Sequence, residues 1–169
     1  TIKAKTNGVI CGIPLATEIF HYVDPNLEVL SLIEDGEIVD KNTQIISIKG
    51  KISSILISER TVLNFLQRLS GIATETNKYV SEISGIECKI IDTRKTTPGL
   101  RQLEKYAVRT GGASNHRMNL SDGILIKDNH IEALKAKGLS LKQGVIIAKS
   151  KAPHTLKVEV ETETLEQVQ

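Results

Sequence analysis

Positively charged side chains gather just after two short apolar segments of this sequence. Arg94 and Lys95 follow the first segment, Lys127 follows the second, and Glu161 comes at the end of a third. In parallel α/β proteins, ligands bind at the carboxyl ends of the strands, where the following loops meet. Cations that converge there with a carboxylate suit a substrate with several negative charges, bound through its phosphates or carboxylates, with a divalent metal as an option.

Each of these features also has an ordinary structural explanation. An Arg-Lys pair in a loop is usually solvated, and the pair Gly111–Gly112 suits the end of a helix. Glu159 and Glu161 alternate with valines, as in a strand with one face in water. Their convergence on one edge of the predicted sheet makes coincidence the weaker explanation. The sequence holds no P-loop and no strand followed by Gly-x-Gly-x-x-Gly, so side chains and other loops would bind any phosphate.

Arg60 has an unusual place in the predicted helical region of residues 53–84. Apolar residues recur there at helical spacing, and Arg60 lies four residues after Leu56 and three before Leu63. A guanidinium on a buried stripe needs an anionic partner. The sequence leaves open a local ion pair with Glu59, a side chain that reaches water, and a role in a binding site. The region is expected to form two helices or one kinked helix.

The first 50 residues predict a small α+β segment with antiparallel strands. The expected elements are strands over 9–12, 27–33 and 44–48, a turn over 34–37, and a helix over 15–23 that Pro14 begins.

From residue 85 the pattern changes to short apolar strands that alternate with helices. The expected strands are 89–91, 123–126 and 156–160, and the expected helices follow Gly99, cover 131–137 and 141–149, and begin near residue 162. This alternation is typical of a parallel sheet covered by helices, in a barrel or a doubly wound fold.

Composition excludes several classes of protein. The net charge of +2, with only two Phe and three Tyr, does not suit a nucleic-acid-binding surface. The longest apolar runs are too short to span a bilayer, so no membrane partner is expected. Cys11 and Cys88 fit no metal or redox spacing and predict two free thiols in a cytoplasmic protein.

Several multi-residue motifs resemble the quinolinate phosphoribosyltransferase family, also called the carboxylating nicotinate-nucleotide pyrophosphorylases. Residues 59–74, with the sequence Glu-Arg-Thr-Val-Leu-Asn-Phe-Leu-Gln-Arg-Leu-Ser-Gly-Ile-Ala-Thr, are similar to its signature helix. The other motifs follow in the family's order and spacing and are Asp92–Gly99, Asn115–Arg117, Leu125–His130 and Val158–Glu161. One departure is Ala113, where the family more often has a third glycine.

The resemblance implies an enzyme that transfers phosphoribose from phosphoribosyl pyrophosphate to quinolinate, with Mg²⁺ and no organic cofactor. The products would be nicotinate mononucleotide, pyrophosphate and CO₂, within de novo NAD biosynthesis. The implied substrate-binding residues are Arg60, Arg94, Lys95, Thr96, His116, Arg117, Lys127 and Glu161. Lys127 and Glu161 would be catalytic, and Glu161 would also bind the metal together with ligands outside this chain. Arg60 would act from the neighbouring subunit of a homodimer, with a higher oligomer as an alternative.

The expected fold is α/β, with a small N-terminal α+β sandwich-like domain before a parallel βα barrel-type domain. Residues 1–84 would form the first domain with its connecting helices, and residues 85–169 the first βα units of the barrel. Because a (β/α) barrel needs about 250 residues, both ends are expected to be missing. Two alternatives remain open: a related phosphoribosyl- or glycosyltransferase with another acceptor, and a non-catalytic module that binds anionic metabolites.

Overall fold

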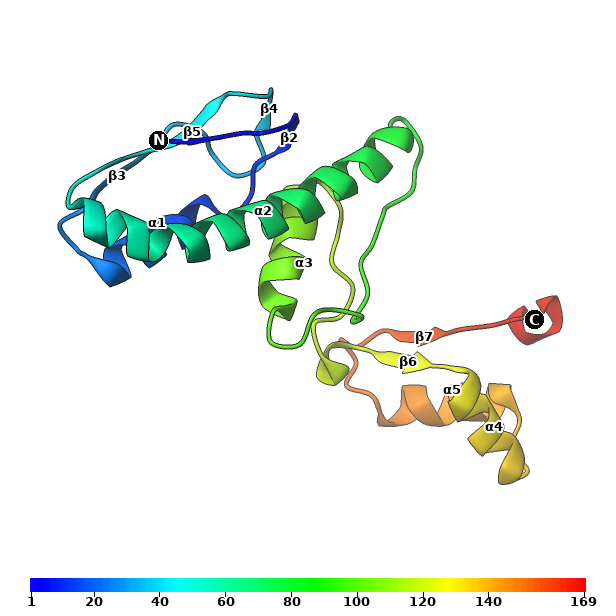
Figure 1. Cartoon of the computed structure of the whole chain (residues 1–169). Helices are drawn as coiled ribbons and strands as arrows, with labels where there is room; N and C mark the ends of the chain where they lie inside the picture. Colours follow the sequence, from blue (N-terminus) through cyan, green and yellow to red (C-terminus); the bar gives the residue numbers. More distant parts are fainter. The chain divides into compact units, whose positions relative to one another are not determined.

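The computed structural model describes residues 1–169 without a gap. The chain forms two compact units, residues 1–116 and residues 117–169 (Figure 1). The first unit combines antiparallel strands with three helices, and the second combines a parallel strand pair with helices that follow each strand. All sheets are open. Because both units contain helices and strands, the chain is a mixed α/β protein.

Antiparallel strands open the first unit, as the sequence predicts. The strands are β1 (Ile2–Lys3), β2 (Gly8–Val9), β3 (Glu28–Ser31), β4 (Ile38–Val39) and β5 (Gln44–Lys49). β5 lies between β1 and β3 in one sheet, and β2 pairs with β4 in a second. β2 is shorter than expected because the N–H of Cys11 donates to Ser70 Oγ, at 3.0 Å, in place of a strand partner.

Helix α1 (Ile13–Val23) begins near Pro14, as expected. Proline suits the first turn of a helix, because the N–H that it lacks has no partner within the helix there. The Asp35 carboxylate accepts the N–H groups of Gly12 and Ile13 at 2.9 Å and so caps this end. Phe20, on the opposite side of the helix from solvent, is buried in the core with Ile46.

Helix α2 (Ile52–Glu82) is one helix of 31 residues that continues through Gly71. It lies beside α1, and both can be followed in Figure 1. The predicted apolar stripe is wrong at its start, because Leu56 is 63% exposed. The face that packs on the strands and on α1 is instead formed by Ser58, Val62, Leu66, Leu69 and Ala73. Arg60 consequently lies on the exposed surface of the helix.

Helix α3 (Arg101–Thr110) packs against α2 and ends at the glycine pair, as predicted. A Cβ atom on Gly111 would lie 2.4 Å from the carbonyl oxygen of Ala73. Gly112 has a φ of +96°, which glycine adopts more readily than other residues. The pair therefore permits a close approach of α3 to α2 and also ends the helix.

The strand expected over residues 89–91 is absent, which corrects the sequence analysis. Only one parallel bridge forms there, between Ile91 and Ser114. Ile91 is 53% exposed, so its apolar side chain has no core to pack against. With a single bridge, the segment lacks the successive cross-strand pairs that stabilise a regular strand.

The second unit contains one parallel strand pair, as the sequence predicts. Its elements are η1 (Leu120–Asp122, a 3₁₀ helix), β6 (Ile124–Ile126), α4 (Asp128–Ala136), α5 (Leu141–Lys151), β7 (Val158–Val160) and α6 (Leu165–Val168). Ile126 is paired with Val160, so β6 and β7 end side by side. α4 packs against α5, and a Cβ atom on Gly144 would lie 2.3 Å from Leu134 Cδ1.

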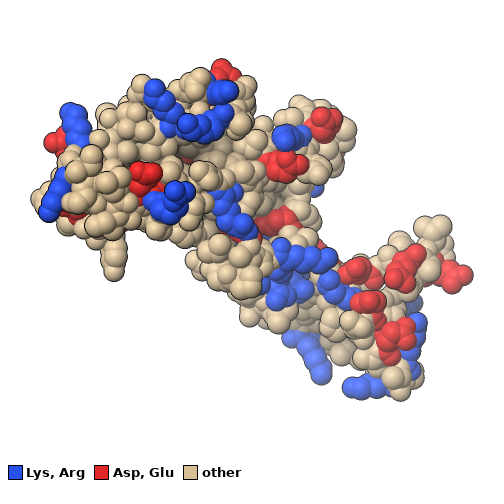
Figure 2. All heavy atoms as spheres, viewed as in Figure 1, with Lys and Arg blue, Asp and Glu red and all other residues tan.

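Both cysteines are free, as predicted, and they differ in environment. Cys11 is buried, and burial raises the pKa of its thiol to about 11, whereas Cys88 is exposed. None of the helices has the length and apolar character needed to cross a membrane. In the view of Figure 2, Lys and Arg form small groups among acidic and uncharged residues on each unit.

Candidate active site

Two loops of the first unit lie side by side at residues 90–92 and 114–116. The N–H of Ser114 donates to the carbonyl of Ile90 at 2.9 Å, and the N–H of Asp92 donates to the carbonyl of Ser114 at 3.2 Å. Arg94, Lys95 and Thr96 directly follow the first loop, and His116 ends the second. The structure thus brings together four of the predicted site residues on two neighbouring segments.

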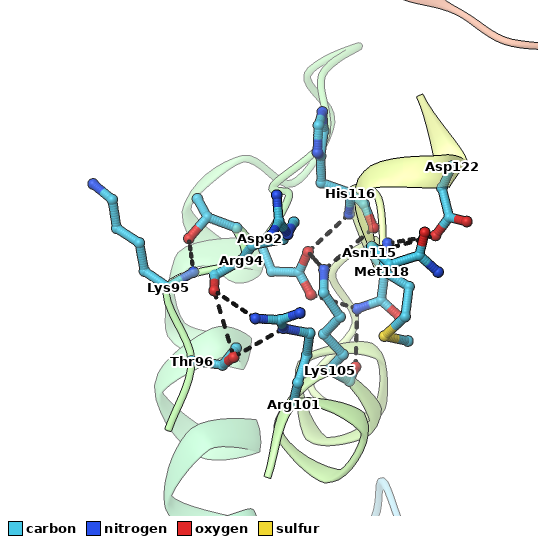
Figure 3. A network of polar contacts seen from close by, with 12 residues as sticks. Asp92, Arg94, Lys95, Thr96, Arg101, Lys105, Asn115, His116, Met118 and Asp122 are labelled. Atoms are coloured by element: carbon cyan, nitrogen blue, oxygen red, sulfur yellow. Dashed lines mark hydrogen bonds and ion pairs between the residues drawn. The ribbon is translucent and has the colours of Figure 1, made fainter. Parts of the chain in front are cut away.

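Side chains reinforce this short backbone pairing (Figure 3). Asp92 Oδ1 accepts from Lys105 Nζ at 2.5 Å and from the N–H of His116 at 2.8 Å. Asp92 Oδ2 accepts from Asn115 Nδ2 at 2.7 Å. The Asn115 amide also donates to the carbonyl of Lys105 at 2.9 Å, and Lys105 Nζ donates to the carbonyl of His116 at 3.2 Å.

The predicted cation Arg94 is partly buried within its loop. Its carbonyl accepts from the N–H of Thr96 at 3.0 Å, and Thr96 Oγ1 accepts from Arg101 Nε at 3.1 Å. The Nε of Arg94 is shielded from solvent and has no hydrogen-bond partner in the chain. A buried guanidinium N–H without an acceptor is costly, so this group suits an anionic ligand. Lys95, in contrast, is exposed.

A second ion pair supports the far end of this loop. Arg68 of α2 contacts Glu104 of α3 and Thr97 Oγ1 through short hydrogen bonds. The other Glu104 oxygen accepts the N–H of Thr97 at 3.1 Å. Burial raises the pKa of Glu104, but the hydrogen bonds from Arg68 and Thr97 outweigh burial and lower the pKa below its usual value. Glu104 is therefore ionised at neutral pH.

The second unit carries three more of the predicted residues, Arg117, Lys127 and Glu161. Lys127 directly follows β6 and Glu161 directly follows β7, and their side chains form an ion pair with 3.5 Å between Lys127 Nζ and Glu161 Oε2. The N–H of Glu161 donates to the carbonyl of Ile126 at 2.8 Å, which fixes the two strand ends together. Arg117 Nη1 donates to the carbonyl of Gly123 at 3.0 Å. Lys127 and Glu161 are thus brought together as predicted.

Arg60 is exposed on α2, and the local ion pair with Glu59, one of the alternatives that the sequence left open, is not formed. The nearest functional side chain on the same helix is Arg68, eight residues later. That spacing places the two residues about 12 Å apart along the helix axis. The Arg60 guanidinium is therefore on the surface of the helix.

The chain contains no group of three or more His, Cys, Asp and Glu side chains arranged to hold a metal ion. The Glu161 carboxylate is a hard oxygen ligand of the kind that Mg²⁺ takes together with substrate phosphates. A single carboxylate is enough for a Mg²⁺ ion whose other ligands are phosphate oxygens and water.

Sequence reasoning missed the charged residues inside α3. Glu104 and Lys105 are buried, and neither residue was singled out from the sequence. The signal that was missed is a charged residue at helical spacing from apolar residues on both sides, as for Arg60. Glu104 lies four residues after Leu100 and three before Ala107. In α3 this spacing identifies Glu104, a buried carboxylate that is paired with Arg68.

Comparisons with known proteins place the chain in a family. The family model of the quinolinate phosphoribosyl transferase N-terminal domain matches residues 1–70, and that of the C-terminal domain matches residues 72–169. The chain therefore belongs to the quinolinate phosphoribosyltransferase family, as its motifs suggest. The family domains meet near residue 71, whereas internal packing divides the chain after residue 116. The division at residue 84 remains a prediction.

Individual relatives agree with this assignment. The chain is 46% identical to the probable carboxylating nicotinate-nucleotide pyrophosphorylases of Synechocystis and of Bacillus subtilis, over 98% and 99% of its length and over 55% and 56% of theirs. It also matches the crystal structure of NadC from Streptococcus pyogenes, with a TM-score of 0.89 and 42% identity, over 98% of this chain and 58% of that one. The chain thus spans little more than half the length of these relatives.

Proposed function

We propose that the intact protein transfers phosphoribose from phosphoribosyl pyrophosphate to quinolinate and releases CO₂, the reaction of a carboxylating nicotinate-nucleotide pyrophosphorylase in de novo NAD biosynthesis. Family membership and the names of the relatives support this proposal. The observation that carries it is the buried, unpartnered Nε of Arg94, on a loop that also holds Lys95 and Thr96. A dicarboxylate is a ligand that such a guanidinium can bind through two parallel hydrogen bonds.

The cations divide into two roles. Arg94 and Arg117, with Arg60 from a second subunit, would bind the quinolinate carboxylates, because a planar guanidinium matches a carboxylate better than an ammonium does. His116 would support them. Lys95 and Lys127 would act as point charges toward the substrate carboxylate or the diphosphate, and Thr96 would line the site.

The reaction needs charge stabilisation more than it needs a nucleophilic side chain. The quinolinate ring nitrogen attacks the anomeric carbon, the C–O bond to pyrophosphate breaks, and its electron pair leaves with pyrophosphate. The Glu161 carboxylate would stabilise the positive charge that develops on the ribose, and Lys127, 3.5 Å from it, would balance the charge of the departing pyrophosphate. The bond to the 2-carboxylate then breaks as CO₂ leaves, and the ring carbon keeps the electron pair and takes up a proton.

Magnesium, a barrel and a dimer complete the proposal. Mg²⁺ would bind with the diphosphate and with Glu161, and it would neutralise charge on the leaving group. The β6–β7 pair with its helices would form part of a βα barrel, and residues 1–84 a sandwich-like domain. The two free thiols suit a cytoplasmic location.

Exposed apolar side chains support the dimer. Tyr22 of α1 and Ile57 of α2 are 93% and 70% exposed and line one shallow surface hollow. Ile52 and Leu56 of α2 are also exposed. An apolar surface of this kind is typical of an interface between subunits. Arg60 belongs to the same helix and would enter the site of the partner subunit.

The direct test supplies the intact protein with quinolinate labelled in its 2-carboxylate, phosphoribosyl pyrophosphate and Mg²⁺. Labelled CO₂ and nicotinate mononucleotide should form in equal amounts. Binding of both substrates without release of CO₂ would favour a non-catalytic module. Turnover of phosphoribosyl pyrophosphate with another acceptor alone would favour a related transferase.

A further inference from the structure

A buried ion pair joins the two loops that carry the predicted site residues. Lys105 is only 1% exposed, and the side chain of Asp92 is 9% exposed. Lys105 Nζ reaches Asp92 on the first loop and the carbonyl of His116 on the second. Asn115 adds a third connection, from its amide to Asp92 and to the carbonyl of Lys105 (Figure 3).

Such a pair is a poor way to gain stability alone. The cost of removing two charges from water often equals or exceeds their attraction, and well-packed apolar residues frequently serve equally well. What apolar residues cannot supply is a set of directed hydrogen bonds. Here the polar contacts take the place of a regular strand pair, because the backbone of these loops forms only the single bridge at Ile91 and Ser114.

The pair also removes a competitor for the substrate-binding cations. Asp92 lies two residues before Arg94, and its carboxylate would attract that guanidinium if it had no partner of its own. Because Lys105 neutralises Asp92 within the protein, the positive charges of Arg94 and Lys95 remain available to an anionic ligand. Arg94 Nε indeed has no partner in the chain.

We propose that Lys105, through Asp92 and Asn115, is a positioning residue that fixes the loop of Arg94 and the loop of His116 for quinolinate. This inference rests on the proposed function. Lys105 does not face the substrate itself, since it is buried beneath both loops. It acts on the reaction by holding the segments that do.

The test replaces Lys105 with methionine in the intact protein, which keeps the length of the side chain and removes its charge. The KM for quinolinate should rise about tenfold or more, as expected for misplaced binding groups. The KM for phosphoribosyl pyrophosphate should rise less, because Lys127 and Glu161 lie in the other unit. Arg109→Met is the matched control, since Arg109 is an exposed cation of the same helix, and it should change neither value.

A second variant separates positioning from stability. Lys105→Met leaves Asp92 buried without a counter-charge and should lower the melting temperature, whereas Lys105→Met/Asp92→Asn removes both charges and should recover much of it. The quinolinate KM should stay high in the double variant, because the hydrogen bonds from Lys105 Nζ to Asp92 and to the carbonyl of His116 are still missing. If the quinolinate KM returned to the wild-type value together with the melting temperature, Lys105 would have only a structural role, and the inference would be overturned.

Hydrogen exchange tests the inference without any substrate. Backbone amides of residues 92–97 and 114–116 should exchange faster in both Lys105 variants than in the wild type, while those of α2 should not change. Unchanged exchange in the two loops would contradict positioning by Lys105. If wild-type protein fails to bind quinolinate while the exchange difference persists, the proposed function is wrong and the positioning of the loops stands.

Discussion

Four positive side chains on and around the loop of residues 92–97 fall into two groups according to their partners. Lys105 and Arg68 are each paired with a carboxylate of the chain, Asp92 and Glu104 respectively. Arg94 and Lys95 have no such carboxylate partner. Asp92 and Glu104 are thus neutralised within the chain, and Arg94 and Lys95 are left with positive charge that suits an anionic ligand.

The fork shape of Arg94 should matter as much as its charge. Arg94→Lys keeps the charge but loses the planar pair of donors, so the catalytic efficiency with quinolinate should fall about 100-fold. The melting temperature should not decrease, because the guanidinium Nε has no partner to lose. Steady-state kinetics and thermal unfolding measure both quantities. Wild-type efficiency in this variant would remove Arg94 from the site.

Glu104 should make the protein sensitive to acid. Its pKa is lower when folded than when unfolded, so its stabilising effect is complete above its unfolded pKa and is lost as the pH falls through the folded value. Glu104→Gln should therefore lower the free energy of unfolding by about 1–3 kcal/mol at neutral pH and by much less near pH 3. Urea unfolding at the two pH values measures the difference.

The control for this prediction is Glu75→Gln. Glu75 forms an exposed pair with Lys78 at 3.0 Å, and exposed pairs of this kind contribute little. An equal loss at both pH values for Glu104→Gln would show that Glu104 is not held ionised by Arg68 and Thr97.

Residue identity alone predicts the charged surface of the site but not its buried support. Arg94, Lys95 and Lys127 were singled out because each lies within four residues after a short apolar run. Lys105 could not be found in the same way, since its partner Asp92 lies 13 residues earlier and only the packed loops bring the two together. Long-range pairing of this kind leaves no periodic signal in a sequence.

At the scale of elements, helices were predicted better than strands. α1, α3 and α5 begin within two residues of their expected starts, because capping residues and helical periodicity are local signals. The segment 89–91 was expected to be a strand from its apolar residues, yet strand formation depends on neighbours that the sequence does not specify.

Tyr106 of α3 connects this helix to the cap of α1. Its hydroxyl donates to Asp35 Oδ2 at 2.7 Å. Burial, followed by the hydrogen bond and negative charge of Asp35, raises the pKa of Tyr106 to about 12. A raised pKa means that this contribution is complete below the unfolded pKa of about 10 and is lost as the pH rises toward 12.

Tyr106→Phe should accordingly cost about 1 kcal/mol of unfolding free energy at neutral pH. The gap between variant and wild type should close as the pH rises from 10 to 12, because only the wild type loses stability through this group. Tyr79→Phe, at a 59% exposed position of α2, should change nothing. A gap that persists at the highest pH would show that ionisation of the Tyr106 hydroxyl does not cause the alkaline loss of stability.

At the scale of the whole molecule, the single chain leaves Arg60 without a function. Arg60 is exposed on α2, and several apolar side chains of α1 and α2 are exposed as well. The motif of residues 59–74 predicts that Arg60 binds substrate, but Arg60 lies on the exposed surface of its own chain. A second subunit would supply both a cover for the apolar surface and a site for the guanidinium.

Mixed dimers test this arrangement. Arg60→Ala and Lys127→Ala should each abolish activity in the intact protein. If Arg60 acts across the interface, a dimer with one subunit of each kind has one complete site, which combines Lys127 of one subunit with Arg60 of the other. Random mixing makes half of the dimers mixed, each with one active site of two, so about a quarter of wild-type activity should return after unfolding and joint refolding. Activity that stays at the level of the separate variants would place Arg60 outside the partner's site.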